Sequence, residues 1–337
     1  MKSIKKVFIF IVIFALAYFA WNTYTAKDLV DIYPCKIKVF RIDSQLSKID
    51  SSNVLSVLNE IKLLHADAFV YYLKNHLSMN FNEFDSKMVD EMLKYVSYSE
   101  VFDFQKRINT KFGNIKELIS EFEIAFGRYS YFFKDSAVPQ KILIVNSFNS
   151  YGIDRYSDNL IIGIDQYLGK DFPGDRYNYI SKRSDLVYIL PDALEYWMSS
   201  TFYKDDYNNF LDEMIYKGKI MYTISLLLPE YEDYKLLRFS QDDLLWCEEY
   251  EYEIWNEILE MDVLYDNNLK KVRSFFFDAP FTKGMPKESP ARLAYWVGYR
   301  IIQSYVKNND ISMNDMLLDE DSQSILLNSK YLPNAKK

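Results

Sequence analysis

The chain has 337 residues, of which 49% are hydrophobic and 26% charged, so it can fold around a large core and is not intrinsically disordered. Lys and Arg number 40 against 48 for Asp and Glu, a net charge of −8, which excludes nucleic acid as the expected partner. The 9 Gly and 9 Pro residues are too few for a loop-rich or all-β chain and favour long helices.

The N-terminus has the features of an export signal. Lys2, Lys5 and Lys6 precede an unbroken apolar run over residues 7–21, which would be about 22 Å long as a helix. That length is short for a membrane span but sufficient for the apolar core of a signal peptide, with the lysines left on the cytoplasmic side. We predict that residues 1–26 are a signal peptide or an N-terminal membrane anchor. The rest is then exported and membrane-associated, with its body in the periplasm.

Three fates of this N-terminal segment are open. It can remain as an anchor, helped by interfacial aromatic residues such as Trp21, or it can be cleaved near residues 15–17 or further on. It can also carry a lipid on a cysteine. The nearest one, Cys35, lies 14 residues beyond Trp21 and follows a Tyr-Pro pair instead of small residues, so we find no good lipidation site.

The thiols and imidazoles are too few and too scattered to build a common site. Cys35 and Cys247 are expected to be unpaired, with Cys247 as a small core residue; a disulfide between them is the alternative. His65 and His76 are 11 positions apart on one predicted helix, which separates them by about 16 Å along its axis. They therefore cannot share a zinc ion, and we expect both to be partly exposed.

The helical period dominates the rest of the chain, and strands are confined to short stretches. A loop containing Gly152 joins two apolar runs as a hairpin connection would. Ser289 and Pro290 suit the N-cap and the first position of the helix that follows them. The predicted strands are 36–42, 141–148 and 159–165, and the predicted helices are 53–76, 88–96, 102–112, 115–132, 190–201, 207–228, 241–262, 289–307 and 313–328.

These elements predict a mainly α fold of the α+β class, in which a helical bundle surrounds one small central β-sheet. We predict a single envelope domain over residues 36–333. Its parts are a helical first half (50–135), the small sheet (140–170) and a helical second half (190–328).

Two surface-forming features allow more than one interpretation. Residues 241–262 contain nine Asp or Glu and no Lys or Arg, which predicts a solvated helix face or, alternatively, a docking surface for a basic partner or cations. The 29 Tyr and 24 Phe residues predict core packing or, alternatively, a ring-lined groove for a glycan or peptide.

Arg292 and Arg300 lie eight positions apart on the predicted helix 289–307, with aromatic residues between them. An arginine beside aromatic rings suits an interface hot spot, a buried pair with an acid such as Glu248, or a plain structural ion pair. The sequence also lacks the short motifs for phosphate binding, serine nucleophiles, dithiol chemistry and EF-hand calcium sites. We therefore assign no catalytic, cofactor-binding or metal-binding residues.

Several sequence blocks carry a resemblance to the gliding-motility lipoprotein GldB family of bacterial envelopes. The similarity covers roughly residues 36–333 and is strongest after 160, although the expected lipidation cysteine is missing. Its most specific parts are Ala-Pro-Phe at 279–281 and Glu-Ser-Pro-x-Arg at 288–292. The other blocks are 164–169, 187–192, 214–222, 226–229, 239–248, 254–255, 282–283, 296–298, 304–305 and 329–331.

The resemblance implies an envelope protein needed for gliding and tied to the machinery that serves type IX secretion. It also implies a distant relation to zincin-type metallopeptidases, in which an H-E-x-x-H helix and a later glutamate bind zinc. The matching helix, near residues 190–197, contains no histidine, and Lys217 stands where the later glutamate would be. Because a lysine cannot replace a carboxylate ligand, we expect a zincin-like architecture without its zinc site, with no metal and no cofactor.

Two functional hypotheses follow. The first is a non-catalytic envelope component that acts as a binding or structural part on a pseudo-metallopeptidase scaffold. Its expected partners are other envelope proteins of the motility and secretion machinery, with membrane contact through the N-terminal segment. The alternative is an exported hydrolase that acts on peptide or cell-wall glycan through carboxylates, since any two of 48 acidic residues can meet in the fold.

Overall fold

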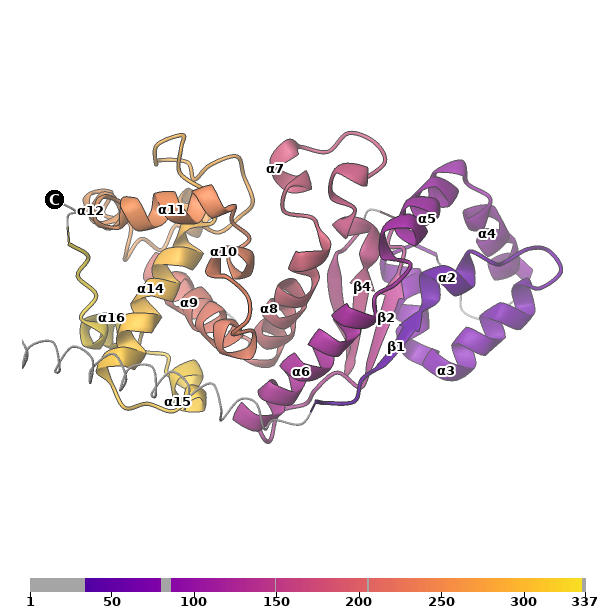
Figure 1. The fold of residues 1–337 in the computed structure, drawn as a ribbon, viewed down its shortest axis with the longest axis horizontal. Helices are drawn as coiled ribbons and strands as arrows, with labels where there is room; N and C mark the ends of the chain where they lie inside the picture. Colours follow the sequence, from indigo (N-terminus) through magenta and orange to yellow (C-terminus); the bar gives the residue numbers. More distant parts are fainter. Residues whose placement is uncertain (1–33, 80–85, 149, 205, 335–337) are drawn as a thin grey trace, which may run out of the picture.

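A four-stranded sheet divides the helices of the molecule into two groups (Figure 1). The computed structural model describes residues 34–79, 86–148, 150–204 and 206–334. The predicted signal peptide or anchor, residues 1–26, lies outside this part. Among the described helices, none combines the length and the apolar character that crossing a bilayer requires.

The sheet is mixed and has the strand order β1–β2–β4–β3. β1 runs parallel to β2, β2 runs parallel to β4, and β3 pairs antiparallel with β4 at the edge. The prediction of a mainly helical chain with one small sheet is confirmed. The strands are β1 (Lys38–Arg41), β2 (Lys141–Val145), β3 (Ile153–Tyr156) and β4 (Asn159–Gly163).

The predicted hairpin between the two most apolar strands is wrong. β2 and β4 are parallel neighbours, with Ile142 opposite Leu160, and the hairpin instead joins β3 to β4. Strands that are buried on both faces belong at the centre of a sheet, where parallel pairing is common. β3 escapes the periodicity argument because its sequence, Ile-Asp-Arg-Tyr, has one aliphatic residue and no clear alternation.

Helices cover both faces of the sheet (Figure 1). Successive side chains of a strand point to opposite faces, so Ile142 and Ile144 enter the larger core while Leu143 and Val145 enter the smaller one. The smaller core is closed by α2 (Ile42–Leu46), α3 (Val54–Asn75), α4 (Ser86–Val96) and the start of α5 (Ser99–Phe112), whereas α6 (Lys116–Phe132) and α8 (Ile189–Thr201) pack in the larger one.

The second half of the chain is helical, as predicted, but two of its predicted helices are each divided. The segment 241–262 breaks at Tyr250, whose φ of −105° and ψ of 23° are not helical, and the segment 313–328 breaks at residues 319–321. The elements are α7 (Asn178–Ser181), α9 (Phe210–Leu227), α10 (Asp233–Leu236), α11 (Gln241–Glu249), α12 (Glu251–Glu260), α13 (Leu269–Val272), α14 (Leu293–Asn308), α15 (Met313–Leu318) and α16 (Ser322–Ser329).

The helix predicted to start at Ser289 starts at Leu293 instead. The carbonyl of Pro290 accepts hydrogen bonds from the backbone N–H and the hydroxyl of Thr282, so it is held by a loop and not by a helical turn. Arg292 then adopts a left-handed conformation with φ of 61°. This turn ends the loop and directs the chain into α14.

Both histidines are buried, contrary to the prediction that they are partly exposed. His65 is 4% exposed and packs edge-on against the ring of Phe40, with 4.3 Å between ring centroids. His76 is 6% exposed, and its Nε2 lies 3.1 Å from the carboxylate of Asp154. Contacts with β1 and β3, distant along the chain, decide this burial.

The two thiols are unpaired, as predicted. Cys35 is half-buried, and Cys247 is fully buried within the larger core. No disulfide therefore constrains the described part of the chain.

Candidate functional site

A pocket of about 410 Å³ lies between α8, α9 and the loops that follow β4. Its wall combines acidic, basic and aromatic side chains. The lining residues are Gly152, Ile153, Gln166, Tyr167, Arg176, Ile180, Ser184, Asp192, Glu195, Tyr196, Ser199, Lys217 and Arg238.

Helix α8 brings two carboxylates to this pocket. Asp192 and Glu195 are three residues apart and therefore share one face of the helix. The other faces are apolar, and Leu190, Leu194 and Trp197 are fully buried against the core. Packing of these large side chains holds α8 in place and positions both acids.

Asp192 has fewer favourable partners than Glu195. Its carboxylate accepts a hydrogen bond of 2.9 Å from the Tyr167 hydroxyl and lies 3.4 Å from Nε of Arg238. Burial outweighs these favourable contacts and raises the pKa of Asp192 to about 6. A carboxyl with such a pKa can gain or lose a proton near neutral pH.

Glu195 is held as an anion by three side chains. Tyr295 donates to its Oε1 at 2.8 Å, Arg292 donates to its Oε2 at 3.1 Å, and the Lys217 ammonium lies 3.8 Å from Oε1. Burial alone would raise the pKa of Glu195, but Arg292 and then Lys217 outweigh it and lower the pKa to about 2. Both carboxylate oxygens are thus engaged, which leaves Glu195 poorly suited to accept a proton.

Lys217 lies beside Tyr295 because α9 and α14 cross in close contact. At the crossing, Gly218 lies against Gly298: a Cβ at Gly218 would be 2.2 Å from the carbonyl carbon of Gly298. The short distance between the helices lets Lys217 of α9 lie 5.4 Å from the ring centroid of Tyr295 on α14. The pKa of Lys217 would be lowered by burial, but Tyr295 and Glu195 outweigh this and raise it.

The bases of the cluster are balanced by acids. Arg292 is 4% exposed and stacks on the Tyr295 ring, with 4.0 Å from Cζ to the centroid. Together with Lys217 and Arg238 it gives three cations, which face the two carboxylates on α8 and Asp278, whose Oδ2 lies 3.8 Å from Arg238. We call these five residues, Asp192, Glu195, Lys217, Arg238 and Arg292, the charge cluster.

The donor set of the charge cluster does not suit a metal ion. Lysine and arginine have no lone pair to offer a metal at neutral pH, and they repel it. In the part of the chain that the structure describes, no three His, Cys, Asp or Glu side chains come together as metal ligands.

Lys217 and Arg292, which the sequence singled out, are brought together here, and the acid that pairs with Arg292 is Glu195 instead of Glu248. Lys217, predicted to stand in for a ligand, lies beside α8, the predicted counterpart of the zinc-binding helix. Arg292 pairs with Glu195, and Arg300 pairs with Glu251 at 2.8 Å, so Glu248 is the partner of neither in these pairs.

The local sequence does not predict the roles of Asp192 and Glu195. The available signal was two acids three residues apart within a helix whose other residues are mostly apolar. An acid on a buried helix needs partners, and those partners come from positions 22 to 100 residues away, which no local pattern reveals.

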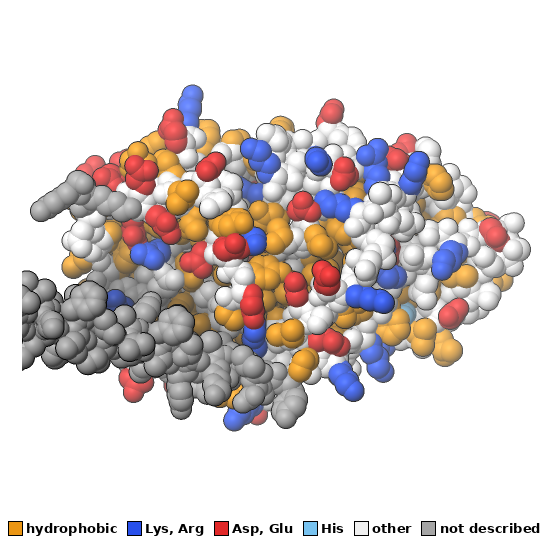
Figure 2. All heavy atoms as spheres, viewed as in Figure 1, with side chains coloured by type: hydrophobic (Ala, Val, Ile, Leu, Met, Phe, Trp, Pro, Cys, Tyr) orange, Lys and Arg blue, Asp and Glu red, His pale blue; other side chains and the backbone are white. Residues whose placement is uncertain are grey.

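The acidic stretch forms surface, as the simpler interpretation predicts. Asp and Glu side chains gather over α11 and α12 in the upper left of Figure 2. Ile254 and Ile258 anchor α12 to the core, whereas Leu245 and Leu259 are about half exposed. Two acids of this stretch pair with bases of the chain itself, Glu251 with Arg300 and Asp243 with Arg183.

A family model matches nearly the whole chain. The model described as gliding motility protein GldB covers residues 23–333, and the family's short name also designates lipoproteins. The resemblance drawn from the sequence blocks is thereby confirmed. A search of curated proteins found no match, and neither did a search of solved structures.

Proposed function

Because the chain belongs to the gliding motility protein GldB family, whose name indicates a gliding-motility component and an envelope lipoprotein, we propose that it acts there without catalysis. In this proposal it is a binding or structural part of the gliding and type IX secretion apparatus. Its body lies in the periplasm, and its partners are other envelope proteins of that machinery.

The observation that carries the proposal is the ion pairing of Glu195 with Lys217 and Arg292. On a zincin-like scaffold, α8 would supply zinc ligands and the residue at position 217 would supply another. Lys217 instead places a positive charge 3.8 Å from Glu195, and Arg292 donates to the same carboxylate. A fixed ammonium in the place of a metal ligand opposes metal binding and stabilises the pocket as an ion-pair network.

One observation favours the alternative, an exported hydrolase. Asp192 lines the same pocket, and its pKa of about 6 is suitable for a general acid or base. Glycoside hydrolysis needs a second carboxylate free to act as a nucleophile or base. Glu195, with a pKa of about 2 and three donors around it, is a weak candidate for that role.

A metal analysis of the purified full-length protein tests the scaffold proposal. We expect far less than one zinc per chain after dialysis against buffered zinc, and no zinc-dependent peptidase activity. Stoichiometric zinc together with zinc-dependent proteolysis would refute the proposal.

Complementation of a deletion strain separates the two functional hypotheses. Asp192→Asn keeps the size of the side chain and its hydrogen bond to Tyr167 but cannot transfer a proton as a carboxyl does. We expect this variant to restore function at normal protein abundance, as should Glu257→Gln on the exposed face of α12. Loss of function in Asp192→Asn alone, with unchanged abundance and melting temperature, would instead support hydrolysis.

A further inference from the structure

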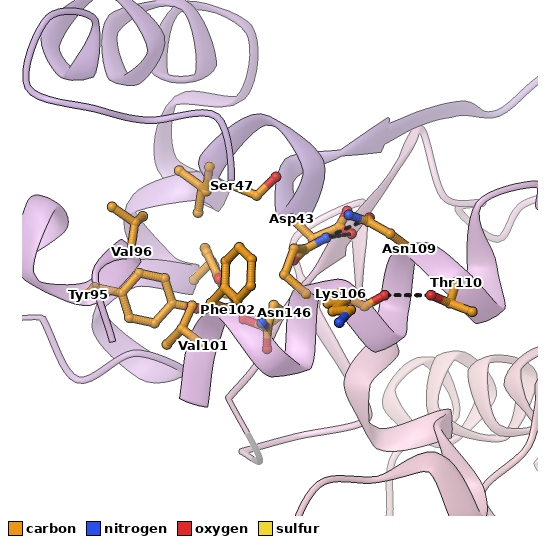
Figure 3. A pocket seen from close by; sticks show the side chains of 13 residues that line it. Asp43, Ser47, Tyr95, Val96, Val101, Phe102, Lys106, Asn109, Thr110 and Asn146 are labelled. Atoms are coloured by element: carbon orange, nitrogen blue, oxygen red, sulfur yellow. Dashed lines mark hydrogen bonds between the residues drawn. The ribbon is translucent and has the colours of Figure 1, made fainter. Parts of the chain in front are cut away.

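A second pocket, of about 440 Å³, opens at the carboxyl ends of β1 and β2 (Figure 3). Asp43 follows β1 by two residues, and Asn146 comes directly after β2, so the two parallel strands deliver both side chains to the same edge of the sheet. In open sheets, ligands bind in the crevice at the carboxyl ends of parallel strands. The volume is in the range of small-molecule sites.

The floor of this pocket is polar and electrically balanced. The buried Asp43 carboxylate accepts hydrogen bonds from Nε and Nη2 of Arg41, at 2.8 and 2.7 Å, and from Gln105 at 3.0 Å. The remaining nitrogen of Arg41 donates to the carbonyl of Phe112 at 2.7 Å. With its guanidinium engaged in this way, Arg41 has little capacity to bind an anionic ligand.

Asn146 carries a buried donor that lacks an acceptor. The residue is 3% exposed, its Oδ1 accepts from the backbone N–H of Phe148 at 3.1 Å, and its carbonyl accepts from the Tyr72 hydroxyl at 2.7 Å. The bond to Phe148 fixes the amide orientation, so Nδ2 must be the donor group, and it has no partner among the described residues. A buried donor without an acceptor is unfavourable, and a ligand oxygen would satisfy it.

The walls of the pocket are apolar and include an aromatic ring at the mouth. Leu46, Val96 and Val101 line the pocket, and Phe102 is 68% exposed at its edge (Figure 3). Lys106, on the same helix as Phe102, adds a positive charge to the lining. A cation would therefore meet Lys106, and the floor offers no free cation to an anion, because Arg41 is paired with Asp43.

We propose that this pocket binds a neutral sugar residue. An oxygen of the sugar accepts from Nδ2 of Asn146, and the apolar C–H face of the ring packs on Phe102. The combination of a buried amide donor and an exposed aromatic ring suits a molecule with hydroxyls on its edge and apolar faces. The site is separate from the charge cluster and does not depend on the function proposed above.

Saturation-transfer NMR on the full chain tests the site with four related probes. The neutral sugars glucose and N-acetylglucosamine are expected to bind, at least one of them measurably. Glucosamine, which is cationic, is expected to bind at least about tenfold more weakly, because it meets Lys106. Glucuronate, which is anionic, is expected to bind no more tightly than the neutral sugars, because Arg41 is already paired with Asp43. Equal binding of glucosamine, or tighter binding of glucuronate, would overturn the assignment of a neutral ligand.

Two substitutions place the binding in this pocket. Phe102→Ala changes an exposed side chain and Asn146→Asp keeps the acceptor for Phe148 while removing the donor; each is expected to weaken sugar binding roughly five- to tenfold. Phe277→Ala, an exposed ring (51%) outside the pocket, is the matched control and should bind like the wild type. Melting temperatures verify that each variant is folded.

Three outcomes would overturn the proposal. The first is an absence of saturation transfer from the wild type to both neutral sugars. The second is wild-type affinity in Phe102→Ala and Asn146→Asp, which would place binding elsewhere. The third is binding of an uncharged blocked dipeptide under conditions in which neither neutral sugar binds.

Discussion

The two carboxylates of α8 show how neighbours decide the chemistry of a residue. Asp192 and Glu195 lie three positions apart in one helix, yet the pKa of the first is raised to about 6 and that of the second is lowered to about 2. Burial is the largest influence on both. Only Glu195 has a combination of Arg292, Lys217 and Tyr295 close enough to reverse it.

Replacing Glu195 by Gln should destabilise the protein by about 3 kcal/mol, because it leaves Arg292 and Lys217 buried without their anion. Urea unfolding monitored by circular dichroism measures the change. Glu257→Gln, on the exposed face of α12, is the control and should change the free energy of unfolding by no more than about 0.5 kcal/mol. A near-neutral Glu195→Gln would show that the ion pairs contribute little.

Asp192 should make the protein less stable as the pH rises. Its folded-state pKa of about 6 is above its usual value of 3.8, so between these values the folded state binds more protons than the unfolded state. Its contribution is complete below about pH 4 and is lost as the pH rises through 6, which amounts to roughly 2–3 kcal/mol. Comparing unfolding free energies of wild type and Asp192→Asn at pH 4 and pH 7 isolates this slope. If the unfolding free energy depends on pH in the same way in both proteins, the raised pKa is not that of Asp192.

The Glu195 contribution has the opposite sign. Its folded-state pKa is lower than its usual value of 4.5, so its stabilisation is present above that value and is lost as the pH falls toward 2. The acid limb of the stability curve should therefore flatten in Glu195→Gln.

At the scale of elements, the crossing of α9 and α14 depends on two glycines. A Cβ at Gly298 would lie 2.1 Å from the carbonyl oxygen of Met214, which no side chain can tolerate without moving the helices apart. The same crossing brings Lys217 of α9 beside Tyr295 of α14, and both side chains contact Glu195. Close helix contact and the charge cluster are therefore coupled.

Gly298→Ala should cost ~3 kcal/mol because the added methyl group overpacks the crossing. Thermal unfolding measures the loss. Lys307→Ala, at the exposed end of the same helix, should have little effect. If Gly298→Ala unfolds like the wild type, the helices do not cross as closely as the structure indicates.

At the scale of the whole molecule, the sheet separates two hydrophobic cores. Side chains from one face of β2 and β4 enter the core that contains α8, α9 and α14, and those from the other face enter the core under α2–α4. Cys247 lies inside the larger core, while Cys35 is half-buried near its edge. The two thiols can therefore report on the integrity of the fold.

A small thiol reagent should modify Cys35 in the native protein and Cys247 only after global unfolding. Burial raises the pKa of the Cys247 thiol and blocks access to it. Mass spectrometry of the labelled protein counts the modified sites, with Cys35→Ser and Cys247→Ser as controls. If neither thiol is labelled in denaturant until a reductant is added, the two cysteines form a disulfide instead.

The sequence alone determined the mainly helical class, the central sheet and the family, because these depend on local periodicity and on blocks of residues that lie next to each other. The bounds of the helices 53–76 and 115–132 were predictable to within one residue at each end, since their apolar faces repeat along the chain. The kink of α3 at Ala66, whose φ is 36°, was not predicted.

Tertiary structure alone decided the parallel order of β2 and β4, the burial of both histidines and the charge cluster. Each depends on residues far apart in the chain: Glu195 meets Arg292 across 97 positions, and His76 meets Asp154 across 78. Electrostatic and packing energies depend on distance in space, so a carboxylate's pKa and partners cannot be obtained from its neighbours in sequence.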